Sequence, residues 1–500
     1  MSLTVWISLA TASLLLLYSH RRNVRRSFSL ANIPGPKSTS WLQGTFREVL
    51  SPAAWDFHKR ILKEYGQVVR IDGFMGDKLL LVFDPKAMHH ILVKDAVMYE
   101  KVDLAMVTLV MGKGLVGITG EPHRKQRKML NPVFSIAHMR NMLPIFYNVV
   151  DKLENGLSAK LQNDASHGPQ EIEMLSWMSR AALELIGQAG LGYSFDDLST
   201  EATAHPYPAI LKQLVTTGSS LWFLHISAFR LHILPLILKF GTQDLRRRIL
   251  NMIPWKVGHH LRDMSDYLWD TSKQIYEGKK KALAEGDEAV SRQIGMGKDI
   301  MSILIFGAVD EEHVHLTAIV RMNMEEEEGS ENKLDEDEVL GQMSVLIFAG
   351  MDTTSSALAR VLHLLSTRPE IQDKLRQEII DARSANGNKH ILYDQLVSLP
   401  YLDAICRETL RLYSPVSHVI RYALQDTVLP LSTPIAGIDG TLITELHVPK
   451  NTHIIISVLN SNRNPAIWGP DALEWKPERW LSPLPDELVE AHIPGVYSHL

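Results

Sequence analysis

A short run of small and polar residues interrupts the longest apolar helical pattern in this 500-residue sequence. The segment Ala349-Gly350-Met351-Asp352-Thr353-Thr354 follows directly after Val345-Leu346-Ile347-Phe348. Glycine lowers the stability of a helix by about 1 kcal/mol relative to alanine, and a buried carboxylate needs polar partners. Residues that break the local rules in this way indicate a functional site. Small residues let another group approach the helix backbone, and an Asp–Thr pair can relay protons. The alternative is a helix interface with a satisfied polar pair.

Glu408 and Arg411 are three residues apart, which places both side chains on one face of a helix. Glu121 and Arg124 have the same spacing, so the spacing alone identifies nothing. Arg479 lies in the turn-like segment Pro477-Glu478-Arg479-Trp480, and arginine can make bidentate hydrogen bonds. We expect Glu408, Arg411 and Arg479 to form one buried, mutually satisfied network.

A basic block, His123-Arg124-Lys125-Gln126-Arg127-Lys128, opens a further helical pattern. His123 and Arg127 are four residues apart and share a helix face, so they could hold an anion. Taken alone, such a block is also typical of a solvated cationic face.

The glycine pattern of dinucleotide-binding loops occurs once, in Gly112-Lys113-Gly114-Leu115-Val116-Gly117, after a stretch at 107–111 that could be a strand. A dinucleotide site needs a helix to begin directly after these glycines, whereas Gly120 and Pro122 follow. The sequence therefore predicts a flexible loop. Cys406 is the one cysteine of the chain, which excludes intrachain disulfides, cysteine-rich zinc sites and cysteine-ligated iron–sulfur clusters. The net charge of −5 does not favour a nucleic-acid-coating protein.

The first 19 residues carry no charged side chain, and His20, Arg21, Arg22, Arg25 and Arg26 follow at once. A membrane-spanning helix needs roughly 20 apolar residues, and positive charges mark its cytosolic side. We therefore predict a transmembrane anchor at 1–19, a basic and proline-rich linker at 20–40, and a catalytic domain at 41–500 on the cytosolic side. A buried first helix is the alternative. Pro34-Gly35-Pro36 would act as a stiff elbow in the linker.

The body is predicted to be mainly helical with small β-sheets contributed by both ends of the chain. We expect a hairpin at 67–71 and 78–83, a helix capped by Asp84-Pro85, and a strand near 452–458. Helices are expected at 144–161, with Pro144 in the first turn, and at 175–191, 338–367, 369–384 and 399–413. The acidic run 324–338 is expected to be a solvated loop.

The order of these motifs resembles that of the eukaryotic cytochrome P-450 family of haem-thiolate monooxygenases, most of all its fungal membrane-bound members. The resemblance runs from the anchor to Trp480 and includes Asn464-Pro465 and Trp468-Gly469-Pro470. It implies the cytochrome P-450 fold and haem b as cofactor. It also implies an oxygen-binding groove at Ala349 and Gly350, with Thr353 hydrogen-bonding to the oxygen being activated and Asp352 supplying protons.

The resemblance assigns the haem propionates to Arg127, His123 and Arg421, although His123 stands where the family commonly has tryptophan. Glu408, Arg411 and Arg479 match a structural triad that supports folding and haem retention. The implied partners are O2, a hydrophobic small molecule and an NADPH-dependent flavin reductase, at the endoplasmic reticulum membrane with the catalytic domain facing the cytosol. Secondary metabolism is the expected context. The expected substrate lining is 107–120, 211–240, 345–349 and 414–420, which is largely apolar.

Two features depart from the family pattern. The cysteine loop that ligates the haem iron, and the helix after it, would begin close after Leu500, and Cys406 cannot replace that cysteine because it lies in the helix of Glu408 and Arg411. Residues 305–319 form an insertion between two helical patterns. We expect both features to reflect an unspliced intron and a missed terminal exon. The alternative function is that of a catalytically inactive, haem-free paralogue or truncated product that acts at most as a binding protein.

Overall fold

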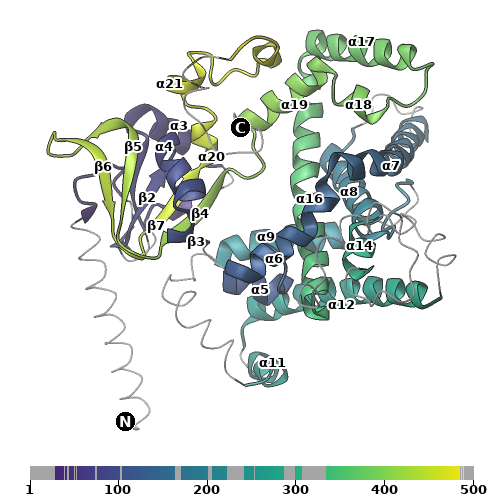
Figure 1. Cartoon of the computed structure of the whole chain (residues 1–500), viewed down its shortest axis with the longest axis horizontal. Helices are drawn as coiled ribbons and strands as arrows, with labels where there is room; N and C mark the ends of the chain where they lie inside the picture. The colour runs from purple at the N-terminus through teal and green to yellow at the C-terminus, as the bar shows by residue number, and fades with distance from the viewer. Residues whose placement is uncertain are drawn as a thin grey trace. The chain divides into compact units, whose positions relative to one another are not determined.

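The computed structural model describes residues 29–488, except 39, 42–43, 50, 52, 74–75, 102–103, 164–170, 201–204, 222–240, 253, 286–298, 307–333, 485 and 487. The predicted anchor at 1–19, part of the linker, most of the expected lining at 211–240 and nearly all of the insertion 305–319 lie outside these residues. The chain divides into two compact units (Figure 1). Unit 1 is formed from residues 1–102, 225–233 and 403–500, and unit 2 from residues 103–224 and 234–402.

Unit 1 contains all seven strands of the described chain. A five-stranded sheet has the order β1-β2-β7-β4-β3, with β1 (Val68–Asp72), β2 (Lys78–Val82), β3 (Tyr99–Lys101), β4 (His418–Ala423) and β7 (His453–Ser457). β2 and β7 pair in parallel, with Leu81 opposite Ile455, and the other pairs are antiparallel. β5 (Thr427–Ala436) and β6 (Leu442–Val448) form a second, two-stranded sheet. β7 lies between two neighbours and is buried along its whole length, which explains its unbroken Ile454-Ile455-Ile456 run.

The helices of unit 1 are short and surround these sheets. They are α2 (Phe46–Val49), α3 (Trp55–Glu64), α4 (Pro85–His89), α19 (Pro400–Leu412, whose first turn begins in unit 2), α20 (Val458–Ser461) and α21 (Pro465–Trp468). The π-helical turn His90–Lys94 and the 3-10 turns Ala96–Met98 and Pro477–Leu481 complete the unit.

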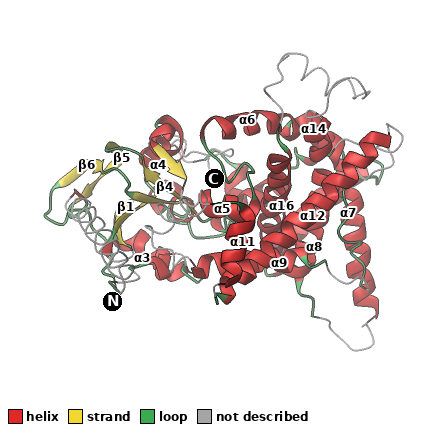
Figure 2. Cartoon of the chain, turned by 90° about the horizontal axis from the view of Figure 1, so that it is seen from below, coloured by secondary structure: helices red, strands yellow, loops and turns green. Residues whose placement is uncertain are grey.

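The described part of unit 2 is helical (Figure 2). It comprises α5 (Leu104–Met111), α6 (Gly120–Leu130), α7 (Ile136–Asn163), α8 (Met174–Ile186), α9 (Tyr207–Leu221), α11 (Gln243–Met252), α12 (Lys256–Glu285), α14 (Ile300–Phe306), α16 (Glu336–Ser366), α17 (Pro369–Ala385) and α18 (Tyr393–Leu396). α16 packs against α8 and α12, and its Met343, Ile347 and Met351 lie in the main apolar core. Among the described residues, α16 is also the one helix that is long and apolar enough to cross a membrane, a test that a core helix passes equally.

The mainly helical fold with small sheets is confirmed, and so is the contribution of both chain ends to one sheet. The predicted hairpin corresponds to β1 and β2. Asp84 caps α4 as expected, since its carboxylate accepts from Ala87 N at 2.9 Å and Pro85 occupies the first turn. The predicted helices at 175–191, 338–367, 369–384 and 399–413 correspond to α8 with its π-helical extension, α16, α17 and α19.

Two predictions about local structure were wrong, and one possibility that the sequence left open is not realised. The possible strand at 107–111 is part of helix α5, because an apolar run this short has no periodicity that separates the two. Helix α7 begins at Ile136 and holds Pro144 in its interior, where the buried Met142 and Val149 offset a cost of about 3 kcal/mol. The end of the acidic run forms the start of α16: Asp335 accepts from Glu338 N at 2.7 Å in a capping box.

Candidate active site

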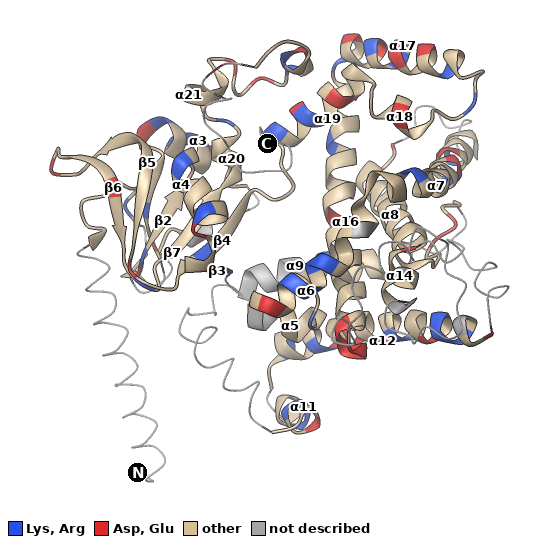
Figure 3. Ribbon diagram, in the orientation of Figure 1, with Lys and Arg blue, Asp and Glu red and all other residues tan. Residues whose placement is uncertain are grey.

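The middle of α16 carries Ala349 and Gly350, the residues predicted to form the oxygen groove. Figure 3 shows acidic residues in the first turn of this helix and a largely uncharged stretch after it. Ala349 is exposed, although it lies between the buried Ile347 and Met351. The Thr353 hydroxyl donates to the carbonyl oxygen of Ala349 at 2.6 Å. Such a bond gives a carbonyl of α16 a second donor and bends the helix slightly.

The side chains of Asp352 and Thr353, which are predicted to relay protons, have different surroundings. The Thr353 hydroxyl is engaged by Ala349, and the half-buried carboxylate of Asp352 makes no ion pair with a residue that the structure describes. Gly350 has a packing role, because a Cβ there would lie 3.1 Å from the Ile186 side chain of α8. The small residue therefore lets helix α8 approach α16 closely.

Helix α6 holds the two predicted anion ligands of unit 2. His123 is half-buried, and Arg127, one turn further on, is exposed and makes no ion pair within the described part of the chain. Gln126 lies between them, is fully buried, and donates to Lys113 O at 3.0 Å and to Glu338 Oε1 at 3.3 Å. Gln126 was not predicted from the sequence; its hydrogen bonds fix α6 relative to α16 and so orient the helix face that carries His123 and Arg127.

Arg421 lies on β4 of unit 1, with Lys101 and Ile454 opposite it on the neighbouring strands. Its guanidinium donates to Ile420 O at 3.0 Å and has no carboxylate partner among the described residues. Burial lowers the pKa of this guanidinium from its usual value. A partly desolvated cation without an acid is the donor that a carboxylate ligand would satisfy.

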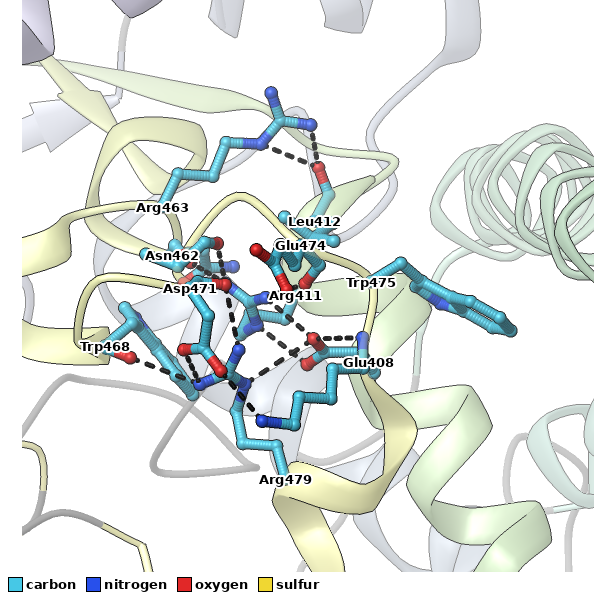
Figure 4. A network of polar contacts seen from close by, with 12 residues as sticks. Glu408, Arg411, Leu412, Asn462, Arg463, Trp468, Asp471, Glu474, Trp475 and Arg479 are labelled. Carbon is cyan, nitrogen blue, oxygen red and sulfur yellow. Dashed lines mark hydrogen bonds and ion pairs between the residues drawn. The ribbon is translucent and has the colours of Figure 1, made fainter. Parts of the chain in front are cut away.

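The predicted network of Glu408, Arg411 and Arg479 is present in unit 1 (Figure 4). Glu408 and Arg411 lie in α19 and are fully buried. The Arg411 guanidinium donates to both carboxylate oxygens of Glu408 at 2.8 Å. Its remaining N–H groups reach three carbonyl oxygens, those of Asn462 at 2.8 Å, Ala472 at 2.6 Å and Glu474 at 3.1 Å. All five donors of the guanidinium are therefore satisfied.

Arg479 joins the network from the 3-10 turn that precedes Ser482. Its Nε lies 3.5 Å from Glu408 Oε1, and its Nη1 donates to Asp471 Oδ1 at 2.7 Å. The Arg479 hydrogen bond holds the pKa of Asp471 below its usual value. Trp480 Nε1 donates to Glu408 Oε2 at 3.0 Å, and the Trp468 ring lies 4.9 Å from the Arg411 guanidinium. Asp471 and the two tryptophans were not expected in the network.

Cys406 is exposed in the interior of α19, two residues before Glu408. The backbone N–H groups of a helix interior are already used, so none is free to stabilise a thiolate there. The structure thus agrees with the expectation that Cys406 is not placed in a glycine-rich ligand loop.

Comparison with known proteins decides the family. A family model described as cytochrome P-450 matches residues 34–487. The chain belongs to the cytochrome P-450 family. It is 50% identical over 492 residues to cytochrome P-450 monooxygenase 91 of Postia placenta, covering 97% of this chain and 85% of that protein. It is also 42% identical over 487 residues to a ganoderic acid synthetase of Ganoderma lucidum, covering 97% and 84%.

Membership makes the chain a cytochrome P-450 monooxygenase, an oxidoreductase with haem b as its cofactor. Each unit by itself offers donors of the kind that a carboxylate accepts from: in unit 1, Arg421 lacks an acid partner among the described residues, and in unit 2, His123 and Arg127 share one helix face. Cys406, held in a helix interior, does not suit the iron. The donors of each unit are therefore chemically suited to a haem propionate, whereas the described residues include no cysteine in a ligand loop.

Proposed function

We propose that this cytochrome P-450 inserts one oxygen atom from O2 into a hydrophobic small organic substrate, with electrons from an NADPH-dependent flavin reductase. The observation that carries the proposal is the polar break in α16, where Thr353 and Asp352 follow the exposed Ala349 within an otherwise apolar helix. These polar residues lower the stability of an apolar helix segment, and a role in proton delivery explains why they are present there.

Arg421, Arg127 and His123 are proposed to hold the two propionates by charge-assisted hydrogen bonds. When bound, haem supplies the oxygen chemistry, and the protein supplies orientation, protons and a dry site. Glu408, Arg411 and Arg479 keep the segment after β7 in place and take no part in the reaction.

Thr353 and Asp352 are proposed to control the proton supply. Thr353 holds its proton at Oγ, now directed to Ala349 O, and the half-buried Asp352 can exchange protons with solvent. Rotation of the threonine hydroxyl would redirect its proton to the reacting oxygen, after which Asp352 or a water can restore it.

An apolar substrate suits the residues around this helix. Leu115 of the loop 112–119 and Leu346 and Phe348 of α16 are partly buried side chains at the margin of the main core. Such side chains bind a ligand by burial of apolar surface, and a few polar groups orient it. The ganoderic acid synthetase among the relatives supports a role in fungal secondary metabolism.

We propose that residues 1–19 anchor the protein in the endoplasmic reticulum membrane, with one catalytic domain, 41–500, facing the cytosol. The basic residues after the apolar run support this orientation. Fusion of a glycosylation acceptor to either end tests it: the acceptor is expected to be modified only when it precedes residue 1. Modification at the other end would contradict the topology.

The activity is tested on the protein encoded by the complete transcript, whose sequence also decides whether 305–319 is retained. The reduced protein with carbon monoxide is expected to show the absorption band of a thiolate-ligated haem, and Cys406→Ser is expected to keep that band. Reductase-dependent transfer of one labelled atom from O2 to an apolar substrate completes the test. A protein that binds no haem but binds apolar ligands would instead support the alternative, a haem-free binding protein.

A further inference from the structure

The glycine-rich loop 112–119 lies directly on the backbone of α16. A Cβ on Gly341 would come within 2.7 Å of both Lys113 N and Gly114 N. A Cβ on Gly114 would lie 2.4 Å from Gly341 O and 2.7 Å from the Val345 side chain. These distances are shorter than any side chain tolerates, so the contact requires glycine on both sides.

This contact explains why the segment resembles a dinucleotide-binding loop without acting as one. The backbone nitrogen atoms of Lys113 and Gly114 lie against Gly341, so α16 occupies the space beside them that a bound phosphate would need. Gly112 has a φ of +81° and would meet Gly341 Cα at 3.1 Å if it carried a side chain. The glycines therefore serve a close approach of loop to helix, which also differs from the flexible loop that the sequence predicted.

A buried pair of amides locks the loop in this position. Gln342, next to Gly341, donates through Nε2 to Gln126 Oε1, and Gln126 donates through Nε2 to Lys113 O at 3.0 Å. Both glutamines are fully buried. Loop, α6 and α16 are thus joined by one chain of hydrogen bonds that water does not reach.

The two ends of the loop are also fastened. Thr108 of α5 donates through its hydroxyl to Gly117 O at 2.7 Å, which ties the far end of the loop to α5. Ser265 of α12 donates to Val110 O at 2.9 Å, which holds the end of α5. Because α16 is packed between α8 and α12, the loop is the part that must move if the contact at Gly341 is disturbed.

We infer that Gly341 is a specificity-determining position: its missing side chain sets how closely loop 112–119 approaches the substrate-facing side of α16. The inference rests on the proposed function, in which Leu115, Leu346 and Phe348 lie around the substrate. A Cβ on Gly114 would clash with Val345, which directly precedes Leu346, and Gly114 directly precedes Leu115. The close approach at Gly341 therefore fixes the spacing between Leu115 and the apolar side chains of α16. A side chain at 341 moves the loop outward and admits larger ligands.

The position of the loop is tested by hydrogen exchange on the full chain. Gly341→Ala is compared with Gly278→Ala, the same change within helix α12, where a Cβ would have nothing within 4 Å. We expect the amides of residues 112–119 to exchange about tenfold faster in Gly341→Ala and unchanged in Gly278→Ala. Equal exchange in both variants would overturn the inference. Gln126→Ala removes the hydrogen bond to Lys113 O and so releases the same loop without a steric clash. If Gly341→Ala does not fold, the exchange rates of residues 112–119 are compared in Gln126→Ala instead.

Ligand selectivity is tested on the haem-loaded protein with imidazole and phenylimidazole. The ratio of their dissociation constants is expected to shift about tenfold toward phenylimidazole in Gly341→Ala and not in Gly278→Ala. An unchanged ratio with a released loop would refute the role in specificity. If the wild-type protein binds neither ligand, the proposed function fails, and the exchange result still decides whether Gly341 positions the loop.

Discussion

Replacing Glu408 by glutamine should destabilise unit 1 far more than its small change in shape suggests. Glu408 is fully buried and accepts from both nitrogens of the Arg411 fork, from Lys476 N at 3.0 Å and from Trp480 Nε1 at 3.0 Å. Glutamine keeps one of the two acceptor oxygens and places an NH2 group where the other was. At least two donors then lose their acceptor, and Arg411 loses its counter-charge.

The magnitude follows from burial. Each buried donor without a partner costs about 1–3 kcal/mol, and removing one member of a buried ion pair costs about 3–5 kcal/mol. We therefore expect Glu408→Gln to lower the free energy of unfolding by about 3–5 kcal/mol. This is a large part of the total of about 5–15 kcal/mol that is typical of a folded protein.

Urea unfolding followed by tryptophan fluorescence measures this change, because Trp468, Trp475 and Trp480 all lie around the network. The matched control is Glu121→Gln. Glu121 forms a pair with Arg124 at the same i,i+3 spacing, but the two side chains are 80% and 81% exposed. The control is expected to change stability by at most about 0.5 kcal/mol. Similar losses in the two variants would refute the view that burial, and not spacing, makes this pair important.

Three further variants test other parts of the site. Thr353→Val, with Thr354→Val as control, should leave haem binding intact and divert at least about nine-tenths of the electrons from product to peroxide, measured as product per NADPH; unchanged coupling would contradict proton control at Thr353. Arg421→Gln should weaken haem binding about tenfold in a haem titration yet raise the melting temperature of the haem-free protein, because burial without an acid disfavours this charge; a lower melting temperature would contradict this assignment. Burial lowers the pKa of His58 and of His418 from 6.5, so the unfolded chain binds protons first and stability should fall as pH drops below about 6.5. His58→Gln with His418→Gln should flatten this dependence of melting temperature on pH, and an unchanged slope would contradict it.

Local rules in the sequence predicted those features whose partners are near in the chain. The cap at Asp84 and the α19 pair of Glu408 and Arg411 follow from spacings of three residues. The three backbone carbonyl groups that accept hydrogen bonds from Arg411 could not be predicted. Every residue has a carbonyl group, and only the fold decides which ones lie close to the guanidinium. Pro144 shows the converse, since tertiary packing keeps a helix intact through a residue that normally ends one.

The sequence predicted which residues of the candidate site are polar or small better than it predicted what those residues contact. The polar break in α16 was correctly placed, but the sequence could not tell that Gly350 faces Ile186 or that Thr353 bonds to Ala349. The role of Gln126 was missed because a glutamine inside a basic block has no distinctive pattern. Its 212-residue separation from Glu338 makes the contact a property of the fold alone.

The hydrogen bond from Thr353 to Ala349 gives the threonine hydroxyl two useful orientations, one toward the Ala349 carbonyl and one away from it. A hydroxyl has one proton, so while Ala349 O receives it the threonine can only accept from other groups. When the hydroxyl turns away, the carbonyl oxygen of Ala349, an exposed residue, gains a free lone pair to which a water molecule can donate. The same rotation thus directs the threonine proton to the reacting oxygen and binds the water molecule that can return a proton to the threonine. The rate of proton supply should therefore change when solvent hydrogen is replaced by deuterium.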